Sequence, residues 1–229
     1  MNKDLGEDFF KDIINQRNSS GALKNIEKFN QIMCWYGCAI REVRTKLEVL
    51  NDEFQSTTAR NPIDNIKSRV KEPMSIYEKL QRRGYPITLN SILNTMHDVA
   101  GIRVICPFID DIYTVADMLT AQDDITLIQR KDYIKTPKPN GYRSLHLVVE
   151  VPIFLSGGKQ LMRVEVQIRT IAMNFWASLE HQIHYKKSQD DVEDVVAQLT
   201  NCANVIYETD MKMQNIRKQL EAEGKLNME

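Results

Sequence analysis

Several features of membrane, secreted and zinc-binding proteins are missing from this sequence. No apolar run approaches the roughly 20 residues needed to cross a bilayer. The first ten residues, MNKDLGEDFF, carry acids where a secretory signal has an apolar core. The four cysteines form neither a CxxC pair nor a zinc-finger spacing. These absences predict a cytoplasmic protein with reduced thiols and no membrane partner.

A net charge is also nearly absent, because 30 basic residues balance 31 acidic ones. General nucleic-acid binders usually carry a basic excess, so no stable nucleic-acid partner is expected. The charge is nevertheless unevenly distributed. Residues 60–103 and 129–146 each carry a net charge of +4, whereas residues 104–128 and 188–229 each carry −5. Two basic clusters in an otherwise acidic chain predict a compact site for anions.

Hydrophobic periodicity predicts a long amphipathic helix near each end, over residues 25–54 and 192–220. Shorter helices are expected at about 63–83, 89–97, 111–121 and 171–187. Strands are expected at 101–106, 125–129, 144–151 and 162–168, and the link between the last two contains Pro152 and Gly157-Gly158. The sequence therefore predicts an α/β (α+β) fold with a mixed sheet of about five strands. Helices would cover one face of this sheet and leave the other polar.

The first basic cluster contains Arg69, Lys71, Ser75 and Lys79. On a helix that begins near Pro73, Ser75 and Lys79 share a face. Cations and a hydroxyl near a helix N-terminus are typical of a polyphosphate site, although a solvated basic helix has the same pattern. The GxxxxGK[ST] loop is missing, which excludes an ordinary P-loop.

An acid at the end of a helix and just before a strand is a second candidate. The segment HDVAGIR places Asp98 there and Arg103 on the strand itself, where metal-nucleotide sites form at sheet edges. A metal-dependent phosphohydrolase would need several more spaced ligands, and the chain has only four histidines.

A turn at KPNGYRSLH brings Tyr142 and Lys138 to the start of a strand, as a platform for a purine base and its phosphates or simply as a core tyrosine. In VEVQIRT, alternation places Glu165 on the polar face of a strand. Paired with Asp98 it would hold Mg²⁺, and alone it would be a surface ion-pair partner. Further along, Glu180, His181 and His184 have helical spacing but lack the HExxH pattern, so packing roles are favoured over zinc.

These motifs, together with NFWASLEHQIHYK, follow one another over about 120 residues. In this order they resemble the synthetase domain of the RelA/SpoT family, and the chain length resembles the stand-alone small alarmone synthetases. The resemblance implies an N-terminal helical extension (1–59), a catalytic domain (60–187) and a helical oligomerisation segment (188–229), with no room for a hydrolase domain. It also implies a nucleotidyltransferase-like sheet and a homotetramer.

The implied reaction transfers the β,γ-diphosphate of ATP to the 3′-hydroxyl of GDP or GTP, and possibly GMP, to form (p)ppGpp and AMP in the stringent response. Asp98 and Glu165 would be catalytic and hold Mg²⁺. The residues implied for ATP are Arg69, Lys71, Ser75, Lys79 and Arg103. Those implied for GDP or GTP are Lys131, Lys138, Tyr142, His146, Gln167, Asn174 and Ala177. Of these, Tyr142 would stack on guanine while Asn174 reads its edge.

Two other functions are compatible with these residues. A nucleotide- or RNA-binding regulator with the same fold would bind ATP and GDP without forming AMP. A different nucleotidyltransferase with a related sheet would release pyrophosphate instead of AMP. The pair of acids argues against the first, because a pure binder of phosphates has no use for them.

Overall fold

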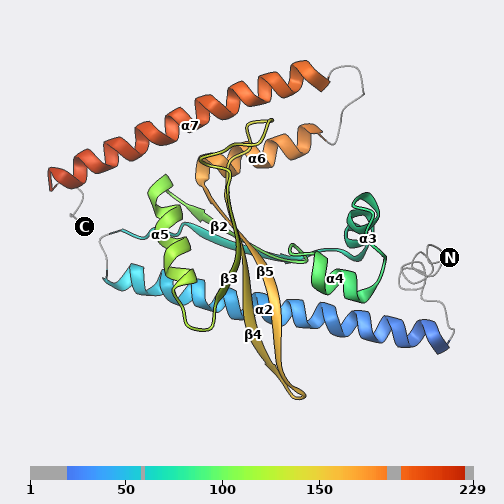
Figure 1. The fold of residues 1–229 in the computed structure, drawn as a ribbon. Coiled ribbons are helices and arrows are strands. Elements are labelled where there is room, and N and C mark those ends of the chain that lie inside the picture. Colours follow the sequence, from blue (N-terminus) through green and yellow to red (C-terminus); the bar gives the residue numbers. More distant parts are fainter. Residues whose placement is uncertain (1–19, 58–59, 185–191, 225–229) are drawn as a thin grey trace.

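The computed structural model describes residues 20–57, 60–184 and 192–224, arranged as Figure 1 shows. The predicted domain boundaries at 59/60 and 187/188 fall at or within the residues outside these ranges. The described elements in chain order are α2 (Ser20–Thr57), β1 (Asn65–Val70), α3 (Pro73–Arg82), α4 (Leu89–Thr95), β2 (Ala100–Cys106), α5 (Ile109–Thr120), β3 (Thr126–Asp132), β4 (Leu145–Leu155), β5 (Gly158–Thr170), α6 (Ile171–His184) and α7 (Val192–Ala222).

The five strands form one mixed sheet in the order β1-β2-β5-β4-β3. β2 and β5 run parallel, while β1 with β2, β4 with β5 and β3 with β4 are antiparallel. The predicted α+β class and mixed sheet are therefore confirmed. The topology places β5 at the centre, so its side chains have neighbours on two adjacent strands, β2 and β4.

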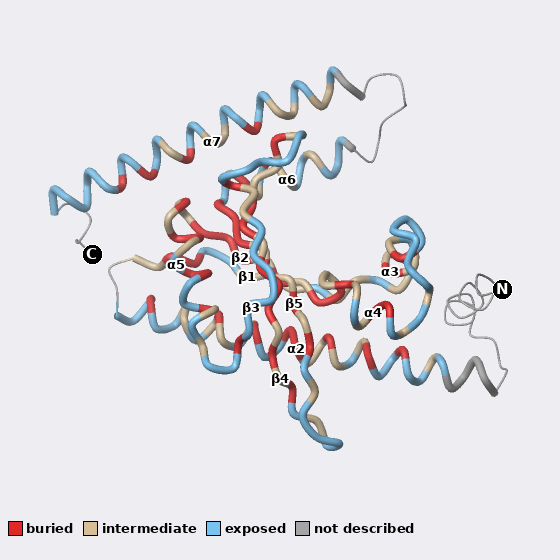
Figure 2. Tube along the Cα trace, in the orientation of Figure 1, coloured by how far each residue is buried: buried red, intermediate tan, exposed pale blue. Residues whose placement is uncertain are grey.

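One face of the sheet packs against helices. Alternate residues of β5, including Val164, Val166 and Ile168, are fully buried, as the period of two predicts. They share a single core with the buried stripe of α2, which includes Tyr36 and Leu47, and with α5. Figure 2 shows this stripe as buried turns along the side of α2 that faces the sheet. The opposite face of the sheet is left for polar side chains.

The prediction of a helix over residues 63–83 is wrong for its first part. Residues 65–70 form β1, an edge strand paired with β2, and the helix begins only at Pro73. Proline fits the first turn of a helix but stops a helix that arrives from the N-terminal side. Glu72 is accordingly extended, with φ −61° and ψ 143°. The short alternation of NIKSRV is hidden by the helical pattern that follows it.

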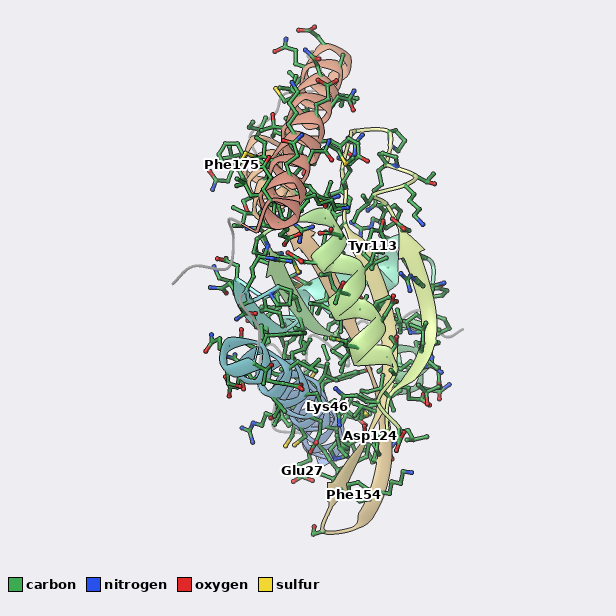
Figure 3. All side chains as sticks on the ribbon, turned by 90° about the vertical axis from the view of Figure 1, so that its left-hand side faces the viewer. Glu27, Lys46, Tyr113, Asp124, Phe154 and Phe175 are labelled. Atoms are coloured by element: carbon green, nitrogen blue, oxygen red, sulfur yellow. The ribbon has the colours of Figure 1, made fainter. Side chains whose placement is uncertain are left out.

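The link between the last two strands is also shorter than predicted. β4 continues through Pro152 to Leu155, and Pro152 pairs with Leu161 of β5. β3 pairs with β4 only as far as Glu150, so beyond that point β4 has one neighbour. A proline is tolerated there because the side without a neighbour needs no N–H donor. The hairpin extends past α2, with Phe154 near its tip (Figures 1 and 3).

The C-terminal helix α7 packs on the rest of its own chain, alongside α6 and α5 (Figure 1). Thr170 at the end of β5 donates a 2.5 Å hydrogen bond to Asp210, and Trp176 of α6 donates to the Leu199 carbonyl at 2.9 Å. Arg217 is buried and pairs with Asp110 at the start of α5. Within the described ranges, no helix combines the length and apolarity that a bilayer span requires.

Candidate active site

The sheet register aligns polar side chains across all five strands on the face opposite the core. Gly101 of β2 has no side chain, which leaves space between its neighbours on the adjacent strands, Arg69 and Glu165. One cross-strand row consists of Lys67, Arg103, Gln167, His146 and Lys131. The next row consists of Arg69, Gly101, Glu165, Val148 and Gln129. The fold thus gathers on one surface residues that are up to about 100 positions apart in the sequence.

Asp98 lies directly before β2 and binds two lysines from the first basic cluster. Its Oδ2 is 2.7 Å from Nζ of Lys71 and 2.5 Å from Nζ of Lys79. Burial raises the pKa of this carboxyl, but the hydrogen bonds from the two ammonium groups outweigh burial and lower the pKa to about 2. Asp98 is therefore an anion across the physiological range and holds Lys71 and Lys79 at the edge of the polar face.

Glu165 lies on the central strand of the sheet, where its partners are an imidazole and a side-chain amide. His146 Nδ1 is 3.3 Å from Oε1, and Gln167 Nε2 donates to Oε2 at 2.8 Å. Burial raises the pKa of Glu165, whereas the contacts with His146 and Gln167 outweigh it and lower the pKa below its ordinary value. Glu165 is thus ionised in the free protein, with hydrogen bonds to both carboxylate oxygens.

The residues implied for ATP line two cavities. The first has a volume of about 440 Å³ and is lined by Arg69, Lys71, Ser75 and Lys79. The second, of about 250 Å³, lies over Gly101 and is lined by Arg69 and Arg103. Burial lowers the pKa of Arg103, and the guanidinium groups of Arg169 and Arg69 lower it further. This concentration of positive charge favours an anionic ligand.

A third cavity, of about 430 Å³, brings together most of the residues implied for the acceptor nucleotide. These are Lys131, Lys138, Tyr142, His146 and Gln167. Lys79 lines this cavity and the first, whereas Asp98 and Glu165 line this one and the second. The two acids therefore lie where the donor-side and acceptor-side cavities meet.

The ring of Tyr142 is surrounded by cations. Lys138 Nζ is 4.6 Å from its centroid and the Arg169 guanidinium carbon is 5.0 Å away. Lys138 is also 4.8 Å from the ring of Tyr133, whose centroid is 6.0 Å from that of Tyr142. An electron-rich aromatic flanked by cations is a platform for a base that carries phosphates.

Asn174 and Ala177 do not line the described acceptor cavity. They lie on α6, where Ala177 is one turn before Glu180 and Asn174 is two turns before His181. Glu180 lines the acceptor cavity and His181 lines the first donor cavity. Oδ1 of Asn174 is buried and has no hydrogen-bond partner among the described residues. These two residues therefore lie on the side of α6 directed towards the cavities.

Asp98 has an oxygen that fits a magnesium ion, and Glu165 lines the same two cavities as Asp98. Oδ1 of Asp98 is buried and lacks a partner in the described part of the chain, although Oδ2 is fully used by lysines. Mg²⁺ is commonly held by one or two carboxylates together with substrate phosphates and water. No group of three or more His, Cys, Asp or Glu side chains suited to a metal occurs among the described residues. The zinc hypothesis involves His184, whose side chain lies outside the described part.

Sequence reasoning missed several residues of the site. Lys67 lines the second cavity beside Arg103, but the prediction of a helix over this segment concealed the strand register. Tyr133 lines the acceptor cavity, and its position in the second basic cluster was an available signal. The strand alternation predicts only that Arg169 faces away from the core. It is in fact buried, and it contacts Tyr142 and Gln167.

Comparisons with known proteins agree with this geometry. The family described as a region found in RelA / SpoT proteins matches residues 68–190, more than half of the chain. GTP pyrophosphokinase YwaC of Bacillus subtilis is 42% identical over 86% of this chain and 93% of its own length. GTP pyrophosphokinase YjbM of the same organism is 36% identical over 85% of this chain and 91% of its own length.

Solved structures of similar proteins have the same fold. Small alarmone synthetase 1 from Bacillus subtilis, bound to its product pppGpp, has a TM-score of 0.78 at 36% identity, covering 85% of this chain and 98% of that one. Small alarmone synthetase 2 from Bacillus subtilis has a TM-score of 0.75 at 41% identity, covering 83% and 98%. Sequence and fold thus agree over most of the chain, which belongs to the RelA/SpoT family.

Proposed function

We propose that this chain synthesises the alarmone (p)ppGpp by transferring the β,γ-diphosphate of ATP to the 3′-hydroxyl of GDP or GTP. The observation that carries this function is the position of Asp98 and Glu165 where two cation-lined regions meet. The relatives support it, since YwaC and YjbM are GTP pyrophosphokinases. Small alarmone synthetase 1 from Bacillus subtilis has been solved both with its product pppGpp and with AMPCPP.

ATP is assigned to the two donor-side cavities. Lys71, Ser75 and Lys79 bind its phosphates in the first cavity, where the two lysines are already held by Asp98. Arg69 lines both cavities and Arg103 lines the second, which supports the proposal that their planar guanidinium groups enclose the adenine.

GDP or GTP is assigned to the acceptor cavity. Tyr142 stacks on guanine, while Asn174 and the backbone at Ala177 contact the base from α6. Lys138 moves from the face of the Tyr142 ring to meet the acceptor phosphates, together with Lys131 and His146. Gln167 lines the same cavity next to Glu165.

The chemistry requires alignment and charge neutralisation more than a covalent nucleophile. The 3′-oxygen of the acceptor forms a bond to the β-phosphorus of ATP as the bond from that phosphorus to the AMP oxygen breaks. Glu165, ionised and central, orients the 3′-hydroxyl and accepts its proton. Asp98 and Glu165 would hold Mg²⁺, which when bound neutralises phosphate charge.

The enzyme is further proposed to be a homotetramer in the cytoplasm, where its nucleotide substrates occur. An exposed apolar stripe on α6 supports the assembly. It consists of Ile171, Phe175, Leu179 and Ile183, which are 41–59% exposed and recur every four residues. Figure 3 shows Phe175 on the outer side of α6, away from the sheet. Such a stripe is larger than isolated exposed side chains and suits a contact between copies.

Turnover with ATP and each of GMP, GDP and GTP tests the function and ranks the acceptors. AMP and a guanosine nucleotide with a 3′-diphosphate are the expected products. Binding of both nucleotides without AMP would instead identify a regulator, and release of pyrophosphate would identify a different nucleotidyltransferase.

A further inference from the structure

Five side chains on the polar face form a closed ring of hydrogen bonds that includes Glu165. On one side, Arg169 Nη2 is 2.5 Å from the Tyr142 hydroxyl, which is 2.7 Å from Nε2 of His146. Nδ1 of His146 is 3.3 Å from Glu165 Oε1. On the other side, the same Nη2 is 2.8 Å from Oε1 of Gln167, whose Nε2 is 2.8 Å from Glu165 Oε2.

Arg169 and Glu165 lie at opposite positions of the ring, and their chemistry determines the direction of every hydrogen bond in it. Arginine only donates, so the Tyr142 hydroxyl oxygen accepts from Arg169 and its own proton is left for Nε2 of His146. An ionised carboxylate only accepts, so Nδ1 of His146 carries the proton that reaches Glu165. Gln167 accepts from Arg169 through its carbonyl and donates to Glu165 through its amide. The ring thus has two arms, one through Tyr142 and His146 and the other through Gln167. In both arms, hydrogen bonds are donated in the direction from Arg169 to Glu165.

Arg169 is placed as an interior anchor for this ring. It is 5% exposed, and among the described residues no carboxylate forms an ion pair with it. Its Nε donates to the Ser144 hydroxyl at 3.4 Å, so the guanidinium is held at Nε as well as at Nη2. A buried cation is costly unless an anion offsets it, and the neutral side chains of the ring connect it to Glu165.

We propose that Arg169 is a positioning residue that acts through the arms Tyr142–His146 and Gln167 to orient Glu165 for the acceptor hydroxyl. The inference rests on the proposed function, because it supplies the base of that reaction with its geometry. It also connects two parts of the proposed acceptor site. Tyr142, which would stack on guanine, and Glu165, which would meet the 3′-hydroxyl, belong to one hydrogen-bonded unit.

The tautomer of His146 provides a test that does not depend on activity. The full chain has four histidines, which can be labelled with ¹⁵N. Comparison of imidazole ¹⁵N spectra of the wild type and the His146→Gln variant identifies the signals of His146. In spectra recorded at a pH at which the ring is neutral, we expect a single tautomer with the proton on Nδ1, as the hydrogen bonds to Tyr142 and Glu165 require. Arg169→Lys, which keeps the charge but loses the planar fork, is expected to convert it to a mixture of forms.

Kinetics separate positioning from a purely structural role. Arg169→Lys is expected to lower kcat about 10- to 100-fold with the KM for ATP unchanged, as misplacement of a catalytic group does. Arg217→Lys is the matched control, because Arg217 is similarly buried but pairs with Asp110 far from the site. It is expected to lower Tm and leave kcat unchanged.

Tyr142→Phe opens one arm while keeping the aromatic ring, and it replaces Arg169→Lys should that variant not fold. It too is expected to lose the single Nδ1-protonated form. A wild-type His146 protonated on Nε2, or variants that fold with the wild-type tautomer and kcat, would overturn the inference. Absence of AMP formation by the wild type would instead refute the proposed function, and the spectra would still test the ring.

Discussion

Asp98 and Glu165 are both acidic, yet their neighbours give them different chemistry. Two ammonium groups neutralise Asp98, and its pKa of about 2 makes it a poor proton acceptor. Glu165 is contacted by His146 and Gln167, and no lysine or arginine among the described residues forms an ion pair with its carboxylate. This difference supports the proposal that Glu165 accepts the hydroxyl proton while Asp98 organises the cations around the donor phosphates.

Glu165→Gln tests this assignment. The amide has the same shape but cannot take up a proton, so AMP formation is expected to fall about 10³-fold. The Tm is expected to fall only slightly, because the glutamine carbonyl keeps one of the two hydrogen bonds that the carboxylate accepts from His146 and Gln167. Chromatographic measurement of AMP, alongside a thermal melt, checks both. Turnover equal to the wild type would exclude Glu165 as the base.

Asp210 provides a pH-dependent test far from the nucleotides. Burial raises the pKa of Asp210, and the hydrogen bond from Thr170 offsets only part of this rise. A raised pKa means that its contribution to stability is present below the unfolded pKa, near 4, and is lost as the pH rises through the folded pKa. At pH 7 the buried charge therefore destabilises the fold.

Asp210→Asn, which keeps an acceptor for the Thr170 hydroxyl, is accordingly expected to increase the free energy of unfolding at pH 7. The gain should shrink as the pH falls through the raised folded pKa towards the unfolded pKa near 4, because the folded wild-type carboxyl is then protonated. Denaturant titrations at the two pH values measure this difference. A variant less stable than the wild type at pH 7 would show that the charge of Asp210 stabilises α7.

At the scale of elements, α7 supports the turn that carries Tyr142. Gly141 has φ +86°, and a Cβ there would lie 2.6 Å from Cβ of Ala203 and 3.1 Å from Cα of Thr200. Thr200 donates to the Pro139 carbonyl, and Arg143 packs on Tyr207 at 4.5 Å. The turn that carries Tyr142 therefore packs directly against α7, and we expect its position to depend on that contact.

Gly141→Ala is expected to lower stability and raise the KM for GDP, with little change in the KM for ATP. Gly84→Ala is the control, because Gly84 has φ +66° and a Cβ there would meet no atom within 4 Å. That substitution adds only backbone strain, about 1 kcal/mol. Steady-state kinetics and thermal melts distinguish the two. Equal effects of both variants on the KM for GDP would contradict the role of α7.

The central strands could be predicted from the sequence, and the edge strand could not. The apolar period of two over residues 162–168 correctly assigns each side chain of β5 to a face, because core packing selects one register. β1 is too short for its alternation to stand out from the helical pattern after Pro73. The motifs contain most of the predicted residues that line the three cavities. The cavity position of Lys67 and the burial of Arg169 depend instead on cross-strand neighbours that no local pattern contains.

At the scale of the whole molecule, the near-neutral net charge is an average over separate roles. Acids of the segment 104–128 form ion pairs that join elements, such as Asp111 with Arg60 and Asp124 with Lys46. Figure 3 shows Lys46 and Asp124 close together beside α2. The basic clusters instead supply most of the cations that line the three cavities. The acids of segment 104–128 thus consolidate the fold, while the cations of the basic clusters line the cavities.

The proposed assembly is tested at the same scale. Phe175→Glu places a charge in the exposed stripe of α6 and is expected to reduce the mass in solution from a tetramer to smaller species. Phe154→Glu, at the 75% exposed tip of the hairpin, is the control and is expected to leave the mass unchanged. Size-exclusion chromatography with light scattering measures both. A Phe175→Glu variant with the wild-type mass would exclude this stripe as the interface.

The central claim is that an intact diphosphate passes from ATP to a guanosine nucleotide. The most direct measurement follows [γ-³²P]ATP incubated with GDP, Mg²⁺ and the wild-type protein. The account predicts label in a guanosine nucleotide with a 3′-diphosphate, together with one AMP for each molecule formed. Label recovered in free pyrophosphate, or ATP left unchanged while both nucleotides are bound, would contradict it.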